Sequence, residues 1–235
     1  KSGNTWIRSF LNSLLFSENN ELNLNKIVID QFPNRKHFKD LIKNLDNIYE
    51  ISSNWIKAQQ NLNKDKKIRF FKTHNIFCNI GKHSFTDTNN TLGVIHIVRD
   101  PRNVVTSLKH HYSIPNYEKA KEFLFDEKRI IFGNFDKKDY PLPALLTSWK
   151  THYLSWKQVK LNYLLIKYED LLDNPIKEFS KISNYLSKIL NVKISEKKIE
   201  NSIRSNSFYN LKKMEESKGF GEFITHNNKK FFNLG

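Results

Sequence analysis

Residues 93–107 read GVIHIVRDPRNVVTS, an apolar run that passes directly into a helix-starting pattern. The run at 94–98 lacks strict alternation, which is typical of a strand covered on both faces. Asp100 followed by Pro101 indicates a helix N-cap and a first helical position. Arg99 falls where the strand ends, and Ser107 about two turns into the helix. This strand-to-helix turn predicts an anion site, with a structural Arg–Asp pair that caps the helix as the alternative.

The rest of the chain repeats this alternation of strands and helices. Apolar segments at 68–72 and 163–167 predict two more buried strands. The segments predicted from spacing and turn residues are helices at 101–112, 144–159 and 175–190, loops at 79–92 and 113–118, and a long insertion at 125–143. The alternation predicts an α/β fold with a central parallel sheet and helices on both faces.

The first six residues, KSGNTW, form a second candidate anion site. A Gly-containing loop precedes an amphipathic helical pattern, and Lys1, Ser2 and Thr5 add donors to the helix N-terminus. The order differs from the Walker A pattern, in which Lys and Ser/Thr follow the last Gly. A solvated Ser–Gly turn is the alternative interpretation. Because such loops follow a strand, we expect a first strand upstream of residue 1.

Polar residues also follow the other two predicted strands. Lys72, Thr73 and His74 end the strand at 68–72, and ligands bind at the carboxyl edge of open α/β sheets. A histidine there can accept a proton from a hydroxyl near neutral pH, although a lone histidine is more often a plain loop residue. Tyr168 follows the strand at 163–167 and is a candidate contact for a base or ribose.

Composition limits the classes of protein. The 235 residues, of which 38% are hydrophobic, suit one domain with a substantial core. No run approaches 18 apolar residues, so no membrane span is predicted. A single cysteine, Cys78, excludes an internal disulfide and predicts a reducing, cytoplasmic compartment. The net charge of +15 is dispersed along the chain, which favours a solvated surface over a specific nucleic-acid partner.

Several segments together resemble the sulfotransferases that use 3′-phosphoadenosine 5′-phosphosulfate (PAPS). The matching segments are 1–6, 72–74, 98–107, 149–156, 167–172 and the pair Ser207-Phe208. The resemblance implies a P-loop-like central sheet and one domain over 1–235 that is trimmed at both ends. It implies transfer of a sulfuryl group from PAPS to an acceptor hydroxyl or amine, with no metal. The resemblance does not identify the acceptor, which could be a small molecule, a glycan, a lipid or a peptide. A homodimer is the expected assembly.

The same resemblance implies roles for individual residues. His74 corresponds to the general base, and Lys1 to the group that stabilises the leaving phosphate. The residues that correspond to cofactor contacts are Lys1, Ser2, Gly3, Asn4 and Thr5 at the 5′-phosphosulfate, Arg99 and Ser107 at the 3′-phosphate, and Trp6, Tyr168, Asn206, Phe208 and Gly235 around the nucleotide. In one alignment, Asn233 and Leu234 stand where the family carries a basic pair, and Lys229 and Lys230 are candidates to replace it. A rival alignment places Ser217-Lys218-Gly219 there, which also lacks the arginine.

Two other functions are compatible with the same anion sites. A P-loop nucleotide kinase would need a complete Walker A loop and acidic Mg²⁺ ligands, and neither is recognisable in the sequence. A non-catalytic, basic nucleotide-binding module would need only the anion sites and the positive charge.

Overall fold

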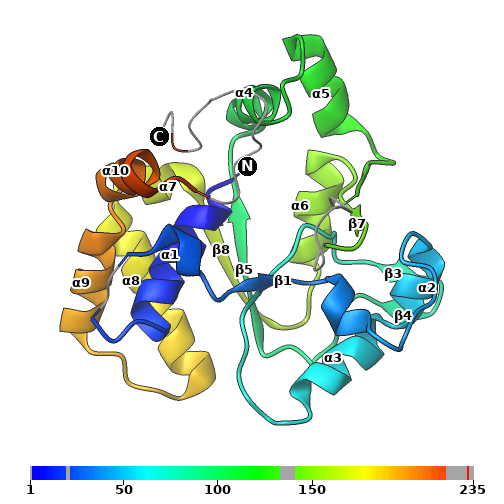
Figure 1. The fold of residues 1–235 in the computed structure, drawn as a ribbon, viewed down its shortest axis with the longest axis horizontal. Helices are drawn as coiled ribbons and strands as arrows, with labels where there is room; N and C mark the ends of the chain where they lie inside the picture. Colours follow the sequence, from blue (N-terminus) through cyan, green and yellow to red (C-terminus); the bar gives the residue numbers. More distant parts are fainter. Residues whose placement is uncertain (1, 20–21, 133–140, 221–231, 233–235) are drawn as a thin grey trace. The chain divides into compact units, whose positions relative to one another are not determined.

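The computed structural model describes residues 2–19, 22–132, 141–220 and 232 (Figure 1). The chain divides into two compact units. Unit 1 comprises Lys1–Val28, Ile95–Lys121 and Leu164–Gly235, and unit 2 comprises Ile29–Val94 and Glu122–Tyr163. The predicted cofactor residues all belong to unit 1, and His74 belongs to unit 2.

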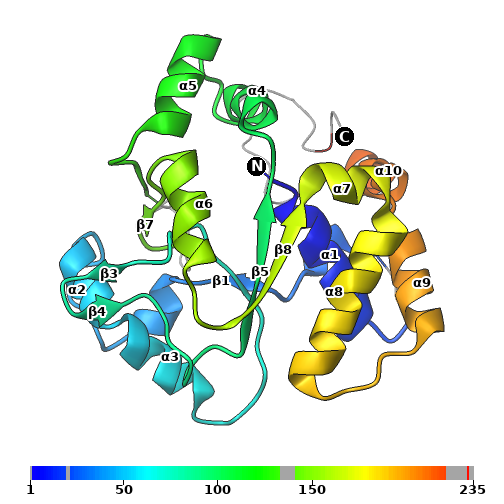
Figure 2. The ribbon, with the colours of Figure 1, turned by 180° about the vertical axis from the view of Figure 1, so that it is seen from behind.

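Unit 1 is mainly helical. Two strands, β5 (Gly93–Val98) and β8 (Asn162–Lys167), enter it and pair with each other. Their arrows point the same way in Figures 1 and 2, so both strands end at one edge. The helices are α1 (Asn4–Leu15), α4 (Pro101–His111), α7 (Tyr168–Asp173), α8 (Pro175–Leu190), α9 (Glu196–Ser205) and α10 (Phe208–Lys218), with a short 3-10 helix η1 (Leu24–Lys26). Helix α5 (Tyr117–Phe125) begins in unit 1 and ends in unit 2.

The core of unit 1 lies between α1 and α8. Trp6, Phe10 and Leu14 recur at four-residue spacing on α1, so one face of the helix is apolar. Phe10 stacks on Phe179 of α8 with ring centroids 4.1 Å apart. Phe10, Leu14 and Phe179 are completely buried, and each such side chain contributes about 1.5–3 kcal/mol of transfer free energy. This packing fixes the direction of α1, and so the position of its N-terminus.

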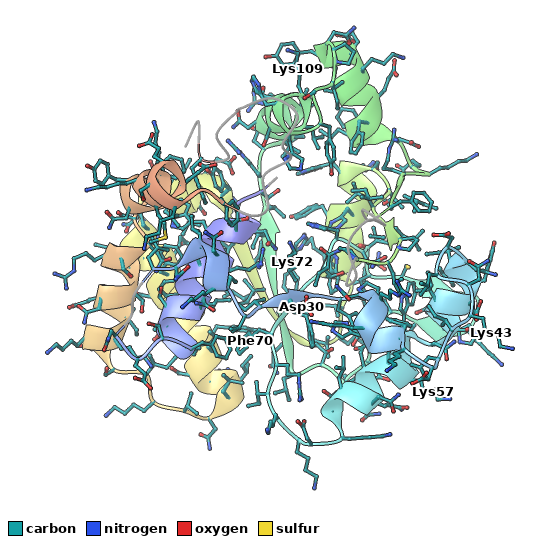
Figure 3. All side chains as sticks on the ribbon, in the orientation of Figure 1. Asp30, Lys43, Lys57, Phe70, Lys72 and Lys109 are labelled. Carbon is teal, nitrogen blue, oxygen red and sulfur yellow. The ribbon has the colours of Figure 1, made fainter. Side chains whose placement is uncertain are left out.

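Unit 2 packs around the indole of Trp55. This side chain is completely buried on α3 (Trp55–Asn63), with Phe32, Phe85 and Trp156 in the same cluster. The other elements are α2 (Ile48–Ser53), α6 (Trp149–Lys157), the 3-10 helix η2 (Arg35–Phe38) and the short strands β1 (Asp30–Gln31), β2 (Phe71–Lys72), β3 (Asn79–Ile80), β4 (His83–Ser84), β6 (Ile130–Ile131) and β7 (Ala144–Leu145). β1 pairs with β2 in parallel, with Asp30 opposite Phe71 and Gln31 opposite Lys72. Figure 3 labels Asp30 on β1 and Lys72 on β2.

The described strands form four two-stranded sheets, β1-β2, β3-β4, β5-β8 and β6-β7. The mixture of helices and strands that the sequence predicts is confirmed. The single central parallel sheet is not seen in the described part of the chain. The strand predicted at 68–72 is confined to β2, because Ile68 is 52% exposed and pairing reaches only two residues. The strands at 93–98 and 162–167 agree with prediction.

The helix predicted at 144–159 is wrong in its first turn. Ala144–Leu145 pairs with β6 instead, and Thr147 has φ of 54°, a left-handed conformation that cannot continue a helix. Ser148 then caps α6 by accepting a hydrogen bond from the Thr151 N–H. The predicted loop at 79–92 contains the β3–β4 hairpin, and that at 113–118 ends early because α5 begins at Tyr117. The insertion at 125–143 carries β6, and its residues 133–140 lie outside the described residues.

The lysines are spread over separate elements. Lys57 lies on α3, Lys109 on α4 and Lys43 in the segment before α2 (Figure 3). No helix in the described ranges is long and apolar enough to cross a membrane. Within those same ranges, no group of three or more His, Cys, Asp or Glu side chains is arranged to hold a metal ion.

Candidate functional site

The N-terminus of α1 rests on the ring of Tyr168. Gly3 is the N-cap, with φ of 89°, a left-handed conformation that favours glycine. A Cβ atom at Gly3 would lie 2.6 Å from Cδ2 and 3.0 Å from Cε2 of Tyr168, so a side chain has no room there. No side-chain hydrogen bond from the N-cap residue closes the helix. The first turn of α1 therefore begins without a side-chain cap, which is compatible with the anion site that the sequence predicts there.

The end of β5 meets the same tyrosine. The Arg99 guanidinium carbon lies 4.2 Å from the centroid of the Tyr168 ring, in cation–π geometry. The backbone N–H of Asp100 donates to Oε1 of Glu169 at 3.0 Å, which ties the two strand ends together. Burial raises the pKa of Tyr168, so its hydroxyl stays protonated and can donate at neutral pH. Tyr168 thus joins the two predicted anion sites, which lie 96 residues apart from Gly3 to Arg99.

Asp100 performs the capping that its sequence position predicts. Its carboxylate accepts from the Arg102 N–H at 2.8 Å and forms an ion pair with the Arg102 guanidinium. The hydrogen bonds from Arg102 hold the pKa of Asp100 down, to about 2. The Arg–Asp capping pair that the sequence allows is therefore made by Arg102, whereas Arg99 lies over Tyr168. Ser107 lies half-buried two turns into α4.

Trp6 is surrounded by aromatic rings and is 3% exposed. Its ring packs edge-on against Tyr168, Phe179 and Phe208, at centroid distances of 6.3, 5.7 and 5.9 Å. Phe179 was not singled out by sequence, and it lies within the helix predicted at 175–190. The predicted contacts of Trp6 and Phe208 with adenine stay predictions. The structure places the Phe208 ring against Trp6, and Trp6 in turn packs against Tyr168 from the first turn of α1.

Asn206 is hydrogen-bonded to Trp6, the central ring of this aromatic cluster. Its backbone oxygen accepts from Nε1 of Trp6 at 2.7 Å. Its completely buried side chain accepts from Ser9 at 2.6 Å and donates to Ser13 at 2.8 Å and to the Ser202 carbonyl at 2.8 Å. The Asn206 amide thus makes its hydrogen bonds to other residues of the protein. Asn206 would therefore influence nucleotide binding by orienting the Trp6 ring rather than by contacting the nucleotide.

Phe232, the described residue of the C-terminal segment 221–235, packs against the aromatic cluster around Trp6. Phe232 is buried, packs edge-on against Phe208 at 6.0 Å, and its N–H donates to Oε2 of Glu215 at 2.8 Å. Lys1 and Gly235 lie outside the described residues, as do Lys229, Lys230, Asn233 and Leu234. Ser2, Asn4 and Thr5 lie in the first turn of α1 or directly before it, and Thr5 is buried.

His74 lies in unit 2, two residues after β2. The segment that carries it, residues 74–77, is hydrogen-bonded to Leu145 of β7 and to Ser155 of α6. The ring of His152 on α6 donates a hydrogen bond to the His74 backbone, and burial lowers the pKa of His152 to about 4. His152 is therefore neutral at physiological pH.

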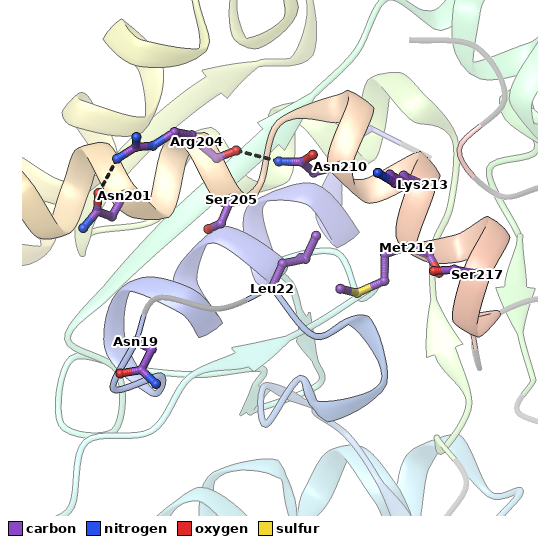
Figure 4. A pocket seen from close by; sticks show the side chains of 9 residues that line it. All are labelled: Asn19, Leu22, Asn201, Arg204, Ser205, Asn210, Lys213, Met214 and Ser217. Carbon is purple, nitrogen blue, oxygen red and sulfur yellow. Dashed lines mark hydrogen bonds between the residues drawn. The ribbon is translucent and has the colours of Figure 1, made fainter.

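A hollow on another part of unit 1 has a volume of about 570 Å³ (Figure 4). It is lined by Asn19, Leu22, Asn201, Arg204, Ser205, Asn210, Lys213, Met214 and Ser217. The Arg204 guanidinium donates to Asn201 at 2.6 Å, and the Arg204 carbonyl accepts from Asn210 at 3.0 Å. None of the predicted cofactor residues lines this hollow.

Comparison with known proteins shows the family. The sulfotransferase domain model matches residues 1–235. Sulfotransferase 1B1 of Canis lupus familiaris is 30% identical over 149 residues, which cover 61% of this chain and 45% of the relative. The luciferin sulfotransferase of Photinus pyralis is 27% identical over 146 residues, which cover 61% of this chain and 35% of the relative. The chain thus matches less than half the length of these two curated relatives.

Among solved structures, mouse sulfotransferase SULT7A1 complexed with PAP is similar, with a TM-score of 0.48 and 22% identity. The match covers 66% of this chain and 51% of that chain. The assignment of family depends on the sequence match, which spans all 235 residues, and the chain belongs to the sulfotransferase family.

Proposed function

We propose that this protein is a PAPS-dependent sulfotransferase whose nucleotide site is built in unit 1. The observation that carries the proposal is the meeting of the Gly3 loop and Arg99 on the Tyr168 ring, in a chain that belongs to the sulfotransferase family. A helix N-terminus and a guanidinium are donors for two separate phosphates. The aromatic rings beside them are typical partners of a nucleotide base. This donor set fits a 3′-phosphoadenosine nucleotide.

Each donor has a distinct part in binding. Residues 1–5 would hold the 5′-phosphosulfate with helix N–H groups and hydroxyls, and Arg99 with Ser107 would hold the 3′-phosphate. Tyr168, which contacts both Gly3 and Arg99, would set the spacing between these two phosphate-binding groups. The proposal also includes the P-loop-like central sheet that the family resemblance implies.

PAPS supplies a sulfuryl group on a nucleotide phosphate that serves as the leaving group. His74 would take the proton from the acceptor hydroxyl as the new oxygen–sulfur bond forms, a role that contributes about 10²–10⁴ in rate. Lys1 would neutralise the charge that develops on the phosphate oxygen as its bond to sulfur breaks. Positioning and charge stabilisation by these side chains are the main source of rate in transfers of this kind.

The acceptor is proposed to be a small molecule with a hydroxyl or amine group. The reducing cytoplasm is the proposed compartment, because the single cysteine of the chain, Cys78, allows no internal disulfide. A homodimer is the proposed assembly.

Ligand binding and turnover test the proposal together. We expect 3′-phosphoadenosine 5′-phosphate (3′,5′-ADP) to stabilise the protein by about 2.7 kcal/mol at 100 times its dissociation constant. His74→Ala should abolish transfer to a phenol from PAPS while nucleotide affinity persists, and His83→Ala on β4 is the matched control. Stabilisation by ATP with Mg²⁺ but not by 3′,5′-ADP would instead indicate a kinase. Binding of 3′,5′-ADP without turnover on any acceptor would indicate a non-catalytic module.

A further inference from the structure

The segment at 74–77 is attached to its surroundings at every residue. His74 accepts a hydrogen bond at its backbone from the His152 ring. The carbonyl of Asn75 accepts from Nε1 of Trp156 at 2.9 Å, and its side-chain Oδ1 accepts from the Leu145 N–H at 2.8 Å. The Ile76 N–H donates to the Leu145 carbonyl at 2.8 Å. A loop residue held through so many backbone contacts has little freedom to shift.

Ser155 completes the set at Phe77. Its Oγ accepts from the Phe77 N–H at 3.1 Å and donates to the His152 carbonyl at 2.8 Å. The hydroxyl therefore joins the segment to the backbone of α6 at the turn that carries His152. The Trp156 ring adds packing against Phe77, with ring centroids 5.6 Å apart.

Three of these contacts come from one face of one helix. His152, Ser155 and Trp156 are spaced i, i+3 and i+4 on α6, and residues at that spacing are neighbours on a helix surface. Their partners, His74, Phe77 and Asn75, are all on the segment that follows β2. The face thus combines two half-buried polar side chains, His152 and Ser155, with the buried Trp156, and each of the three is hydrogen-bonded to the segment.

We propose that the α6 face formed by His152, Ser155 and Trp156 is a positioning device for His74. This proposal rests on the proposed function, in which His74 is the general base. A general base must lie within hydrogen-bond reach of the proton it takes, and a misplacement of about 1 Å can cost a hundredfold in rate. The three residues act through the backbone of the segment, so they are positioning residues and not catalytic ones. Burial keeps His152 neutral, which leaves its ring N–H as a steady donor.

Ser155→Ala is the sharpest perturbation, because it removes the Oγ and leaves the size of the site nearly unchanged. Ser155→Thr keeps a hydroxyl and is the rescue variant. Leu154→Ala is the matched control, since Leu154 is the preceding residue on the same helix and is 42% exposed. Two quantities are measured: amide hydrogen exchange of Phe77 by NMR, and kcat and KM for PAPS with 2-naphthol as the acceptor probe.

We expect Ser155→Ala to raise the exchange rate of the Phe77 amide and to lower kcat about tenfold, the effect of one lost hydrogen bond on a barrier. The KM for PAPS should not change, and Ser155→Thr should restore both quantities. Unchanged exchange at Phe77, or an equal effect in Leu154→Ala, would overturn the proposal.

His74→Ala separates failure of this proposal from failure of the proposed function. If His74→Ala abolishes turnover while Ser155→Ala speeds exchange with kcat unchanged, the segment need not be held and the positioning proposal is wrong. If His74→Ala retains turnover, His74 is not the base; the proposed role of His74 then fails, and the positioning proposal fails with it.

Discussion

Gly3→Ala should disrupt the site at its tightest point. The left-handed conformation at Gly3 costs an alanine roughly 1–2 kcal/mol. The new Cβ would also lie 2.6 Å from Tyr168, and forcing an extra carbon into a packed site typically costs about 1–3 kcal/mol. The two effects together predict a loss of about 2–5 kcal/mol in the free energy of unfolding. Displacement of the Tyr168 ring would also move Arg99, so the affinity for 3′,5′-ADP should fall in the same variant.

Gly81→Ala is the matched control for backbone strain. Gly81 also has a positive φ, 57°, but a Cβ there would meet none of the described atoms within 4 Å. We expect Gly81→Ala to cost only the roughly 1–2 kcal/mol of conformational strain. Urea unfolding gives both free energies, and calorimetry gives the nucleotide affinity. Equal losses of stability in the two variants, with 3′,5′-ADP binding intact in Gly3→Ala, would refute the close contact between Gly3 and Tyr168.

Three more predictions concern other parts of the chain. The pKa of His152 is lowered in the folded protein, so the unfolded chain takes up the proton first, and stability should fall by roughly 1–2 kcal/mol from pH 7 to pH 5. His152→Gln should remove that dependence in urea unfolding. Asn206→Ala should cost about 2–4 kcal/mol, because it removes the buried hydrogen bonds that the Asn206 amide makes to Ser9 and Ser13. A loss below about 0.5 kcal/mol in urea unfolding would contradict this. Asn233→Arg should tighten 3′,5′-ADP binding by about 1.5–3 kcal/mol in calorimetry if that position faces the 3′-phosphate.

The elements with strong local signals were predictable from sequence. The Asn174-Pro175 start predicts α8 with its observed bounds, and Asp100-Pro101 predicts the start of α4. The missed boundary at the start of α6 depends on distant contacts. The Leu145 N–H is bonded to Asn75, 70 residues away in sequence, and this competes with helix formation in a way that local spacing does not reveal. Two-residue strands such as β6 and β7 are equally invisible, because a pair of residues has no periodicity.

The site was predictable as a set of residues but not as a set of contacts. Motif order indicated Gly3, Arg99 and Tyr168, yet nothing in the sequence indicates that the first two contact one and the same ring. Likewise Asn206 was predicted beside the nucleotide, and its bonds to Ser9 and Ser13 required the packing of α9 against α1. Such contacts follow from helix packing across almost 200 residues of chain.

The central claim is that Arg99 holds the 3′-phosphate of the nucleotide, and the most direct test compares two ligands on one variant. Arg99→Ala is titrated calorimetrically with 3′,5′-ADP and with 5′-AMP, which lacks the 3′-phosphate. Arg102→Ala is the control, because Arg102 is three residues along and its side chain is 89% exposed. We predict that Arg99→Ala weakens 3′,5′-ADP binding by about 10–150-fold, the value of a charge-assisted contact, and leaves 5′-AMP binding nearly unchanged. Equal losses for the two nucleotides, or the same loss in Arg102→Ala, would contradict the assignment.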